Sequence, residues 1–167
     1  WEKTKEMLTL KKTMDAMPDV TFYWAGDGPY LEKILPELEK HKNFKWLGRL
    51  QHPDEVKKYL SEIDVYALIS GIDMSPVSLL EAQILEKPVI ATNVGGIPEE
   101  MKDGETGFLV EKGNHGELTS KLSILFNDDE KARQMGINGK RFVVENFSWD
   151  KIAKDFVIMA KKYLKKA

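Results

Sequence analysis

The 167-residue sequence contains no cysteine, which excludes disulfide frameworks, thiolate zinc sites and a cysteine nucleophile and is typical of a reducing compartment. It has no excess of either charge, with 25 Lys and Arg against 27 Asp and Glu, so composition gives no electrostatic reason to bind nucleic acid. No apolar run approaches the roughly 20 residues of a membrane span, and no signal peptide opens the chain. We therefore expect a cytoplasmic protein that binds no nucleic acid.

Metal-ligating and nucleophilic patterns are also scarce. The three histidines, His41, His52 and His115, form no HxH or HExxH pair, and no carboxylate cluster has the spacing of metal ligands. Ser70 and Ser78 lack the GxSxG motif of serine hydrolases. The sequence thus predicts neither a protein metal site nor serine hydrolase chemistry.

Hydrophobic residues, by contrast, make up 42% of the chain, as in an ordinary globular domain, and their spacing alternates between strand-like and helix-like segments. The expected strands span residues 20–25, 44–47, 64–69, 88–92 and 108–110, and the expected helices span about 7–17, 30–38, 53–63, 77–86, 115–127, 129–145 and 149–165. Such alternation calls for βαβ crossovers and a parallel sheet.

We therefore predict a single α/β domain over residues 1–167, with a Rossmann-like open parallel sheet flanked by helices. In such sheets ligands bind beyond the carboxyl ends of the strands. The loops expected to matter are 26–29, 48–53, 70–76 and 93–98. Because the chain begins at Trp1 rather than Met, we expect it to be one domain of a longer protein.

The pair Gly26-x-Gly28 follows a predicted strand and precedes a predicted helix, as in a dinucleotide-binding fingerprint. Leu31 occupies the place of the third glycine, and Pro29 removes a backbone donor. No acidic residue ends the next strand to hold a ribose. We interpret this segment as a tight turn and not as an NAD site.

The segment over residues 70–82 has more chemical content. A helix that starts near Pro76 presents free backbone N–H groups at the sheet edge, where an anion is favoured. Asp73 lies just before that helix and Glu81 about one turn into it, and carboxylates suit paired sugar hydroxyls. The alternative is that Asp73 is a helix cap and Glu81 a surface charge.

This segment resembles the E-x7-E signature of the GT-B glycosyltransferases of family 4, the glycosyl transferases group 1. Other motifs of the C-terminal domain in that family follow in the expected order over nearly the whole chain. They are Gly26-Asp27-Gly28-Pro29, Leu47-Gly48, Asp73-x7-Glu81, Pro88-Val89-Ile90-Ala91, Gly95-Gly96-x-x-Glu99, Asp103-Gly104-x-Thr106-Gly107 and Phe147-Ser148-Trp149.

The resemblance implies a binding site for a nucleotide-diphosphate sugar. Asp73 would contact hydroxyls of the donor sugar and Glu81 the ribose, although Asp73 is one methylene shorter than the family's Glu. The remaining binding residues implied are Ser75, Val77 and Ser78 at the diphosphate, Gly95 and Gly96 in the neighbouring loop, and Leu50 beside the base. Lys5 falls near the family's catalytic lysine, although Glu6 replaces the glycine that follows it, and the partner arginine would precede Trp1.

The implied activity is retaining transfer of a hexose-type sugar to a glycan, lipid or other hydroxyl, in polysaccharide or glycolipid biosynthesis. No metal or other cofactor is implied, because Lys, Arg and helix-end amides would neutralise the leaving diphosphate. The acceptor would bind a separate N-terminal domain that this chain lacks, so this domain alone would be inactive. The alternatives are a non-catalytic α/β nucleotide-binding or interaction module, or a sugar-nucleotide epimerase.

The last predicted helix carries an apolar stripe formed by Ile152, Phe156, Met159, Ala160 and Tyr163. Residues 151–167 also contain six Lys and one Asp. One interpretation is that the stripe packs on this domain and the lysines are solvated. In the resembled family the last helix crosses to the N-terminal domain. We therefore expect its last turns to be less ordered than the sheet or held by a neighbouring chain, with weak affinity for an anionic membrane surface, which would place the protein peripherally at the inner membrane face.

Overall fold

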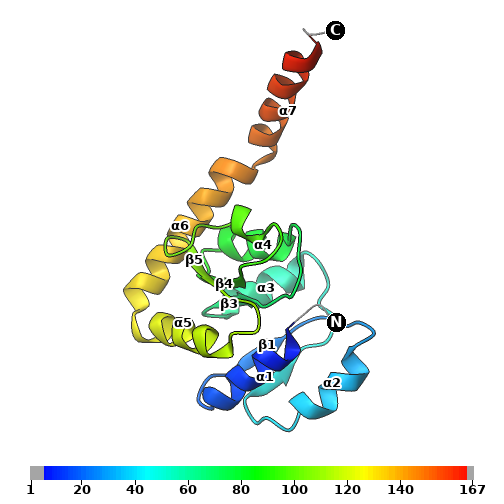
Figure 1. Ribbon diagram of the computed structural model, residues 1–167, viewed down its shortest axis with the longest axis vertical. Helices are drawn as coiled ribbons and strands as arrows, with labels where there is room; N and C mark the ends of the chain where they lie inside the picture. Colours follow the sequence, from blue (N-terminus) through cyan, green and yellow to red (C-terminus); the bar gives the residue numbers. More distant parts are fainter. Residues whose placement is uncertain (1–5, 165–167) are drawn as a thin grey trace.

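The computed structural model describes residues 6–164 (Figure 1). All the strands and helices expected from the sequence are present, with bounds shifted by a few residues, and one short 3-10 helix was not expected. The strands are β1 (Phe22–Trp24), β2 (Phe44–Trp46), β3 (Tyr66–Leu68), β4 (Val89–Thr92) and β5 (Gly107–Val110). The helices are α1 (Met7–Ala16), α2 (Leu31–Leu38), α3 (Asp54–Glu62), α4 (Val77–Ile84), the 3-10 helix η1 (Ile97–Glu99), α5 (His115–Asn127), α6 (Asp129–Phe147) and α7 (Trp149–Leu164).

The strands pair in parallel, which confirms the fold class, and within residues 6–164 their hydrogen bonds give two sheets. β1 pairs with β2, with Phe22 opposite Phe44. The second sheet has the order β3-β4-β5, with Tyr66 opposite Val89 and Ala91 opposite Leu109.

The central strand β4 is covered on both faces, as expected of a parallel strand in an α/β fold. Val89, Ile90 and Ala91 are all 0% exposed. Val89 and Ala91 belong to the core cluster formed with α3 and α4, whereas Ile90 belongs to the cluster formed with α5. A two-sided core of this kind fixes both ends of β4, including the end that leads into the loop at residues 93–96.

Helix α1 connects the two sheets through packing. Met7 and Met14 belong to the cluster between α1, α2 and the first sheet. Leu10 and Met17 pack instead against the cluster beneath α5. Figure 1 shows α1 beside β1, with α5 on its other side. Side chains of α1 therefore pack in the cores of both sheets.

Helices α4 and α6 cross closely because α6 carries glycines at the contact. A Cβ placed on Gly136 would lie 1.9 Å from the carbonyl oxygen of Glu86, at the end of α4. One placed on Gly139 would lie 3.2 Å from Cγ of Gln83. Only residues without side chains allow this approach, so the glycines determine how deeply α4 lies in the domain.

Helix α7 continues from α6 and points away from the rest of the domain (Figure 1). It has no buried residue, and the stripe residues Ile152, Phe156, Met159 and Tyr163 are 44–65% exposed. The interpretation that the stripe packs on this domain is therefore wrong for the residues described. Among residues 6–164 no helix combines the length and the apolar character needed to cross a membrane.

Replacing Gly136 with Ala should destabilise the domain by about 2–3 kcal/mol, because the new methyl group collides with the Glu86 carbonyl and α6 must move. Gly116→Ala is the matched control, since Gly116 is also helical and its Cβ would meet only Asn114 Oδ1 at 3.7 Å. That variant should gain about 0.5 kcal/mol from reduced backbone entropy of the unfolded chain. Urea denaturation measures both, and equal stabilities would contradict the close packing of α4 and α6.

Candidate active site

The loops that follow β3 and β4 are joined at the carboxyl edge of the second sheet. The backbone N–H of Ser70 donates to Thr92 Oγ1 at 2.9 Å, and Thr92 Oγ1 lies 2.6 Å from the Ser70 carbonyl oxygen. Both residues are 0% exposed. Residues 71–76 therefore leave β3 from a fixed point beside the end of β4.

Gly95 and Gly96 pack directly against the backbone of the loop at residues 71–76. A Cβ on Gly95 would lie 1.9 Å from the carbonyl oxygen of Asp73, and one on Gly96 would lie 1.9 Å from that of Met74. The Gly96 N–H also donates to the Asp73 carbonyl oxygen at 3.0 Å. Both glycines therefore have a packing role against this loop. Direct contact of either glycine with a ligand stays a prediction.

A buried carboxyl group anchors the end of the same loop. Ser75 Oγ donates to Glu100 Oε1 at 2.6 Å, and Gln83 Nε2 donates to the Glu100 carbonyl oxygen at 2.9 Å. Glu100 is 3% exposed, and its Oε2 has no hydrogen-bond partner among residues 6–164. Burial raises the pKa of Glu100, and the charges of Asp73 and Glu99 add to the increase, while the Ser75 hydrogen bond opposes it.

Helix α4 begins at this loop without a side-chain cap. Its first residue, Val77, follows an extended Pro76 and is 63% exposed. The Ser78 side chain is already engaged, since Tyr66 Oη donates to Ser78 Oγ at 2.8 Å, and burial of the Tyr66 hydroxyl raises its pKa to about 12. In the first turn the Leu79 N–H donates to the Pro76 carbonyl oxygen at 2.8 Å. The N–H groups of Val77 and Ser78 are therefore what the helix offers to a ligand.

Two carboxylates flank this helix end, as the sequence predicted. Asp73 lies in the loop before it, with Oδ2 accepting from Ser70 Oγ at 3.3 Å. Glu81 lies on the second turn of α4, and its side chain is 29% exposed. His52 Nε2 lies 2.8 Å from Glu81 Oε1, which connects α4 to the loop after β2. The N-cap residue of α4 is Pro76, so Asp73 does not occupy the N-cap position that the alternative gave it.

Leu50 lies in the same loop as His52. It is half-buried and lines a hollow of about 390 Å³ together with Arg49, Lys58 and Tyr59. The role of Leu50 as an apolar surface beside a base stays a prediction, and the residue lies two positions before His52, which contacts Glu81.

Lys112 places a cation at the carboxyl edge of the second sheet, and no sequence motif pointed to it. Lys112, just after β5, donates from Nζ to the Gly71 carbonyl oxygen at 3.2 Å. A Cβ on Gly71 would lie 2.8 Å from Glu6 Oε1 and 3.0 Å from Lys112 Nζ, so both charged groups crowd this glycine. Lys5, the lysine that the sequence favoured, lies outside the described residues.

The structure thus brings together Asp73, Ser75, Val77, Ser78, Gly95 and Gly96 in two contacting loops and the start of α4. Glu100, His52 and Lys112 carried no usable signal in the sequence, because each contacts a partner 25 to 41 residues away. Across residues 6–164, no group of three or more His, Cys, Asp or Glu side chains could hold a metal ion.

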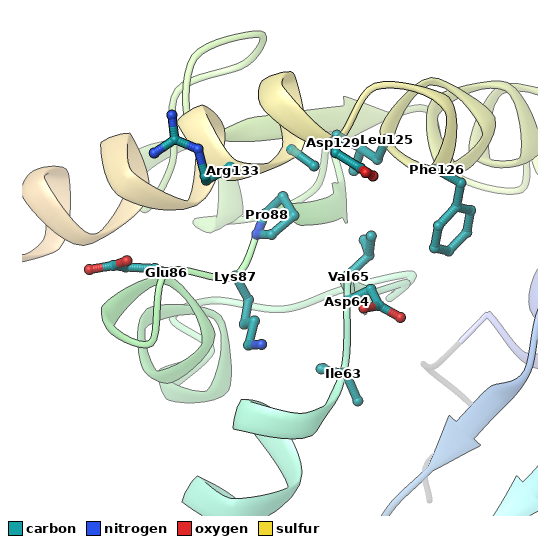
Figure 2. A pocket seen from close by; sticks show the side chains of 11 residues that line it. Ile63, Asp64, Val65, Glu86, Lys87, Pro88, Leu125, Phe126, Asp129 and Arg133 are labelled. Carbon is teal, nitrogen blue, oxygen red and sulfur yellow. The ribbon is translucent and has the colours of Figure 1, made fainter.

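A separate hollow of about 270 Å³ lies at the opposite edge of the second sheet (Figure 2). Figure 2 shows it between Val65 before β3, Pro88 before β4 and Arg133 on α6. Its cations are already engaged, since Lys87 Nζ donates to the Ser61 carbonyl oxygen and Arg133 pairs with Glu130. None of the predicted site residues within 6–164 lines this hollow.

Comparison with known proteins gives matches over most of the chain. The family described as Glycosyl transferases group 1 matches residues 2–142. An uncharacterized glycosyltransferase of Methanocaldococcus jannaschii is 34% identical over 83% of this chain and 40% of its own length. The N-acetyl-alpha-D-glucosaminyl L-malate synthase of Bacillus anthracis is 33% identical over 83% of this chain and 36% of its own length. The chain therefore spans well under half of these curated relatives.

Solved structures share the fold. The C-terminal domain of a glycosyl transferase group 1 family protein from Francisella tularensis is 25% identical, with a TM-score of 0.77 over 89% of this chain and 83% of that one. The HepE protein of Anabaena in complex with UDP-glucose is 20% identical, with a TM-score of 0.85 over 97% of this chain and 46% of that one. At that identity, the second likeness shows the fold alone.

Replacing Glu100 with Gln should stabilise the protein at pH 7 by about 1 kcal/mol, because the amide removes a buried charge and keeps an acceptor for Ser75. The pKa of Glu100 is raised above the usual 4.5, so its ionisation destabilises the folded state as pH rises through the folded pKa, and no penalty exists below the unfolded pKa. The gain should therefore vanish near pH 4 in thermal denaturation. Glu39→Gln, at an exposed carboxylate that is not among the charges acting on Glu100, should show no such gain.

Proposed function

Because the chain belongs to the glycosyl transferases group 1 family, we propose that it is the donor-binding domain of a retaining glycosyltransferase. The donor is a nucleotide-diphosphate sugar, and the group transferred is of the hexose type. We place acceptor binding in a separate domain of the whole protein, in line with the 40% of the archaeal relative that this chain spans. The resemblance recognised from the sequence motifs is confirmed, and the substrate assignments are the proposal.

One observation carries this proposal, namely the uncapped start of α4 between two carboxylates. The first-turn N–H groups of Val77 and Ser78 suit a diphosphate, since a helix N-terminus favours anions. Asp73 and Glu81 then lie on either side along the chain, where ionised oxygens can accept from sugar hydroxyls. An anion site between two acceptors of hydroxyl groups matches the chemistry of a nucleotide-diphosphate sugar.

We assign the donor sugar to Asp73, the diphosphate to the backbone of Ser75, Val77 and Ser78, and the ribose to Glu81. Leu50 supplies an apolar surface for the base, next to the His52 contact with Glu81. Gly95 and Gly96 hold the diphosphate loop in place through their close approach to Asp73 and Met74. Lys112 adds a cation to the same edge, and Lys5 remains the proposed catalytic lysine.

The proposed reaction breaks the bond between the anomeric carbon and the diphosphate oxygen and forms one to the acceptor oxygen on the same face of the sugar. The leaving phosphate oxygen takes the acceptor proton. Helix-end amides and lysine charges stabilise the negative charge that develops on the diphosphate, so no metal ion or other cofactor takes part. The chain alone binds the donor and transfers no sugar, because the acceptor lies in the other domain.

The second candidate is a non-catalytic module that keeps the fold and the nucleotide site. The observation that favours it is Asp73, whose shorter side chain stands where the family signature has Glu. The two candidates differ in sugar recognition, because only the transferase requires Asp73 to contact the donor sugar. Comparing a nucleoside diphosphate with its sugar conjugate therefore separates them.

Glu81→Gln should weaken binding of a nucleoside diphosphate by about 1.5–3 kcal/mol, because a charged hydrogen bond to the ribose is lost. Asp73→Asn should leave the diphosphate unaffected and weaken only its sugar conjugate. Calorimetry with UDP, GDP and ADP and with their glucose or mannose conjugates measures both effects. Glu86→Gln is the control, since Glu86 follows α4 at its other end and pairs with Lys140.

Equal effects of Asp73→Asn on both ligand forms would defeat the sugar assignment and favour the non-catalytic module. Binding of none of the three diphosphates by the unsubstituted chain would defeat the donor-binding function. Sugar transfer to an acceptor by the 167-residue chain alone would contradict the placement of the acceptor in another domain.

We also propose that α7 associates with an anionic membrane surface. Its exposed aromatic residues Trp149, Phe156 and Tyr163 recur every seven residues and so share one side of the helix. Lys151, Lys154, Lys161 and Lys162 lie on the other side, at angles set by the helical repeat. An apolar face opposite a lysine-rich face is the pattern of a helix that lies in a membrane interface.

The chain should float with vesicles that contain anionic lipid at low salt and should separate from them in 0.5 M salt, where the Debye length is about 4 Å. Replacing Lys154 and Lys161 with Gln should weaken flotation, whereas replacing Lys33 and Lys57, exposed on other helices, should not. Absence of vesicle binding at low salt would remove the membrane role.

A further inference from the structure

The contact between His52 and Glu81 is the direct side-chain link from the loop after β2 to helix α4. His52 Nε2 lies 2.8 Å from Glu81 Oε1, across 29 residues of sequence. The His52 side chain is 66% exposed and that of Glu81 is 29% exposed, so the pair lies at the surface of the candidate site and not in the core. The family motifs set out above include no histidine in this loop.

The backbone that carries His52 is firmly held. The Gln51 N–H donates to Glu55 Oε2 at 2.6 Å, and the Glu55 N–H donates to the Gln51 carbonyl oxygen at 3.0 Å. The Lys57 N–H donates to the Pro53 carbonyl oxygen at 2.9 Å. These bonds attach both neighbours of His52 to the first turn of α3. The imidazole therefore starts from a fixed backbone and reaches toward the longer, more flexible side chain of Glu81.

Among the described residues, protein contacts Glu81 through one of its two carboxylate oxygens. Within residues 6–164, Oε1 receives the His52 contact and Oε2 makes no hydrogen bond. A carboxylate held by one oxygen loses rotational freedom while its other oxygen still accepts hydrogen bonds. The arrangement prepares one acceptor for a hydroxyl group before any ligand arrives.

We propose that His52 is a positioning residue that orients Glu81 to accept hydroxyl groups of the ribose of a nucleoside diphosphate. This inference rests on the proposed function, because it takes the ribose to be the partner of Glu81. His52 itself contacts no part of the nucleotide. It acts by donating Nε2–H to Oε1, so that less conformational freedom of Glu81 is lost when the nucleotide binds.

The test is a double-mutant cycle of nucleotide affinity in the full chain. Each variant is titrated by calorimetry with UDP, GDP and ADP, and the tightest ligand is used throughout. His52→Ala should raise Kd about threefold to tenfold, the effect of leaving one side chain unordered. In the Glu81→Ala background the same substitution should change Kd by less than about 1.5-fold, because no carboxylate is left to orient.

Two further variants separate positioning from a general structural effect. His52→Gln keeps an N–H donor at similar reach and should restore most of the affinity. His41→Ala is the control, because His41 lies away from the candidate site. Its Nδ1 pairs with Asp15 Oδ1, 3.2 Å away. This substitution should leave Kd unchanged. Thermal denaturation of His52→Ala and His52→Gln should show the same transition as the unsubstituted chain, since the His52 side chain is mostly exposed.

The outcomes distinguish a failure of the positioning role of His52 from a failure of the proposed donor-binding function. If Glu81→Ala weakens binding while His52→Ala does not, the positioning role is wrong and the ribose assignment survives. An equal loss from His52→Ala with and without Glu81 would also overturn it. If the chain binds a nucleoside diphosphate and Glu81→Ala does not weaken that binding, the ribose assignment and the role of His52 both fail. Binding of no diphosphate would remove the proposed function itself.

Discussion

The candidate site depends on the close approach of two backbone segments, residues 73–74 and residues 95–96. Each approach leaves no room for a Cβ, since one on Gly95 or Gly96 would lie 1.9 Å from a carbonyl oxygen. This contact fixes the loop after β3 against the loop after β4, and the loop after β3 in turn delivers the first turn of α4. The position of Asp73, the direction of α4 and the reach of Glu81 all follow from two residues that have no side chain.

Helix α4 serves both the core and the site. Its inner residues Leu79 and Ala82 are 0% exposed, and Gln83 reaches from the same helix to the backbone of Glu100. The crossing of α6 at Gly136 holds its far end. A helix fixed on both sides presents its N-terminal amides in one orientation, which an electrostatic site requires, because dipoles that are already aligned need no rearrangement when charge develops.

The features that the sequence predicted are those that local residue patterns determine, namely the helices, the strands and the order of the loops. Apolar periodicity placed the helices and strands, and the parallel arrangement implied that Asp73, Gly95 and the start of α4 would meet at one edge, as they do. Contacts between side chains far apart in the sequence could not be predicted from local patterns. Glu100 looks like a surface residue beside Glu99, yet it is 3% exposed. His52 appeared to be an isolated histidine until the fold placed it beside Glu81. Pairing within the sheet also left no signal, because a strand's own residues do not reveal whether both of its edges are occupied.

Helix α1 bears on how the parts of the domain move together. Met7 and Met14 belong to the core cluster with α2 and the first sheet, and Leu10 packs against the cluster beneath α5. The start of the helix is also attached to the second sheet, because the Glu6 N–H donates to the Ile69 carbonyl oxygen at 3.0 Å. A helix shared by two core clusters couples their local opening, because neither cluster can separate without exposing apolar residues of the same helix. Loosening of the first sheet would therefore also loosen the point from which the loop that carries Asp73 leaves β3.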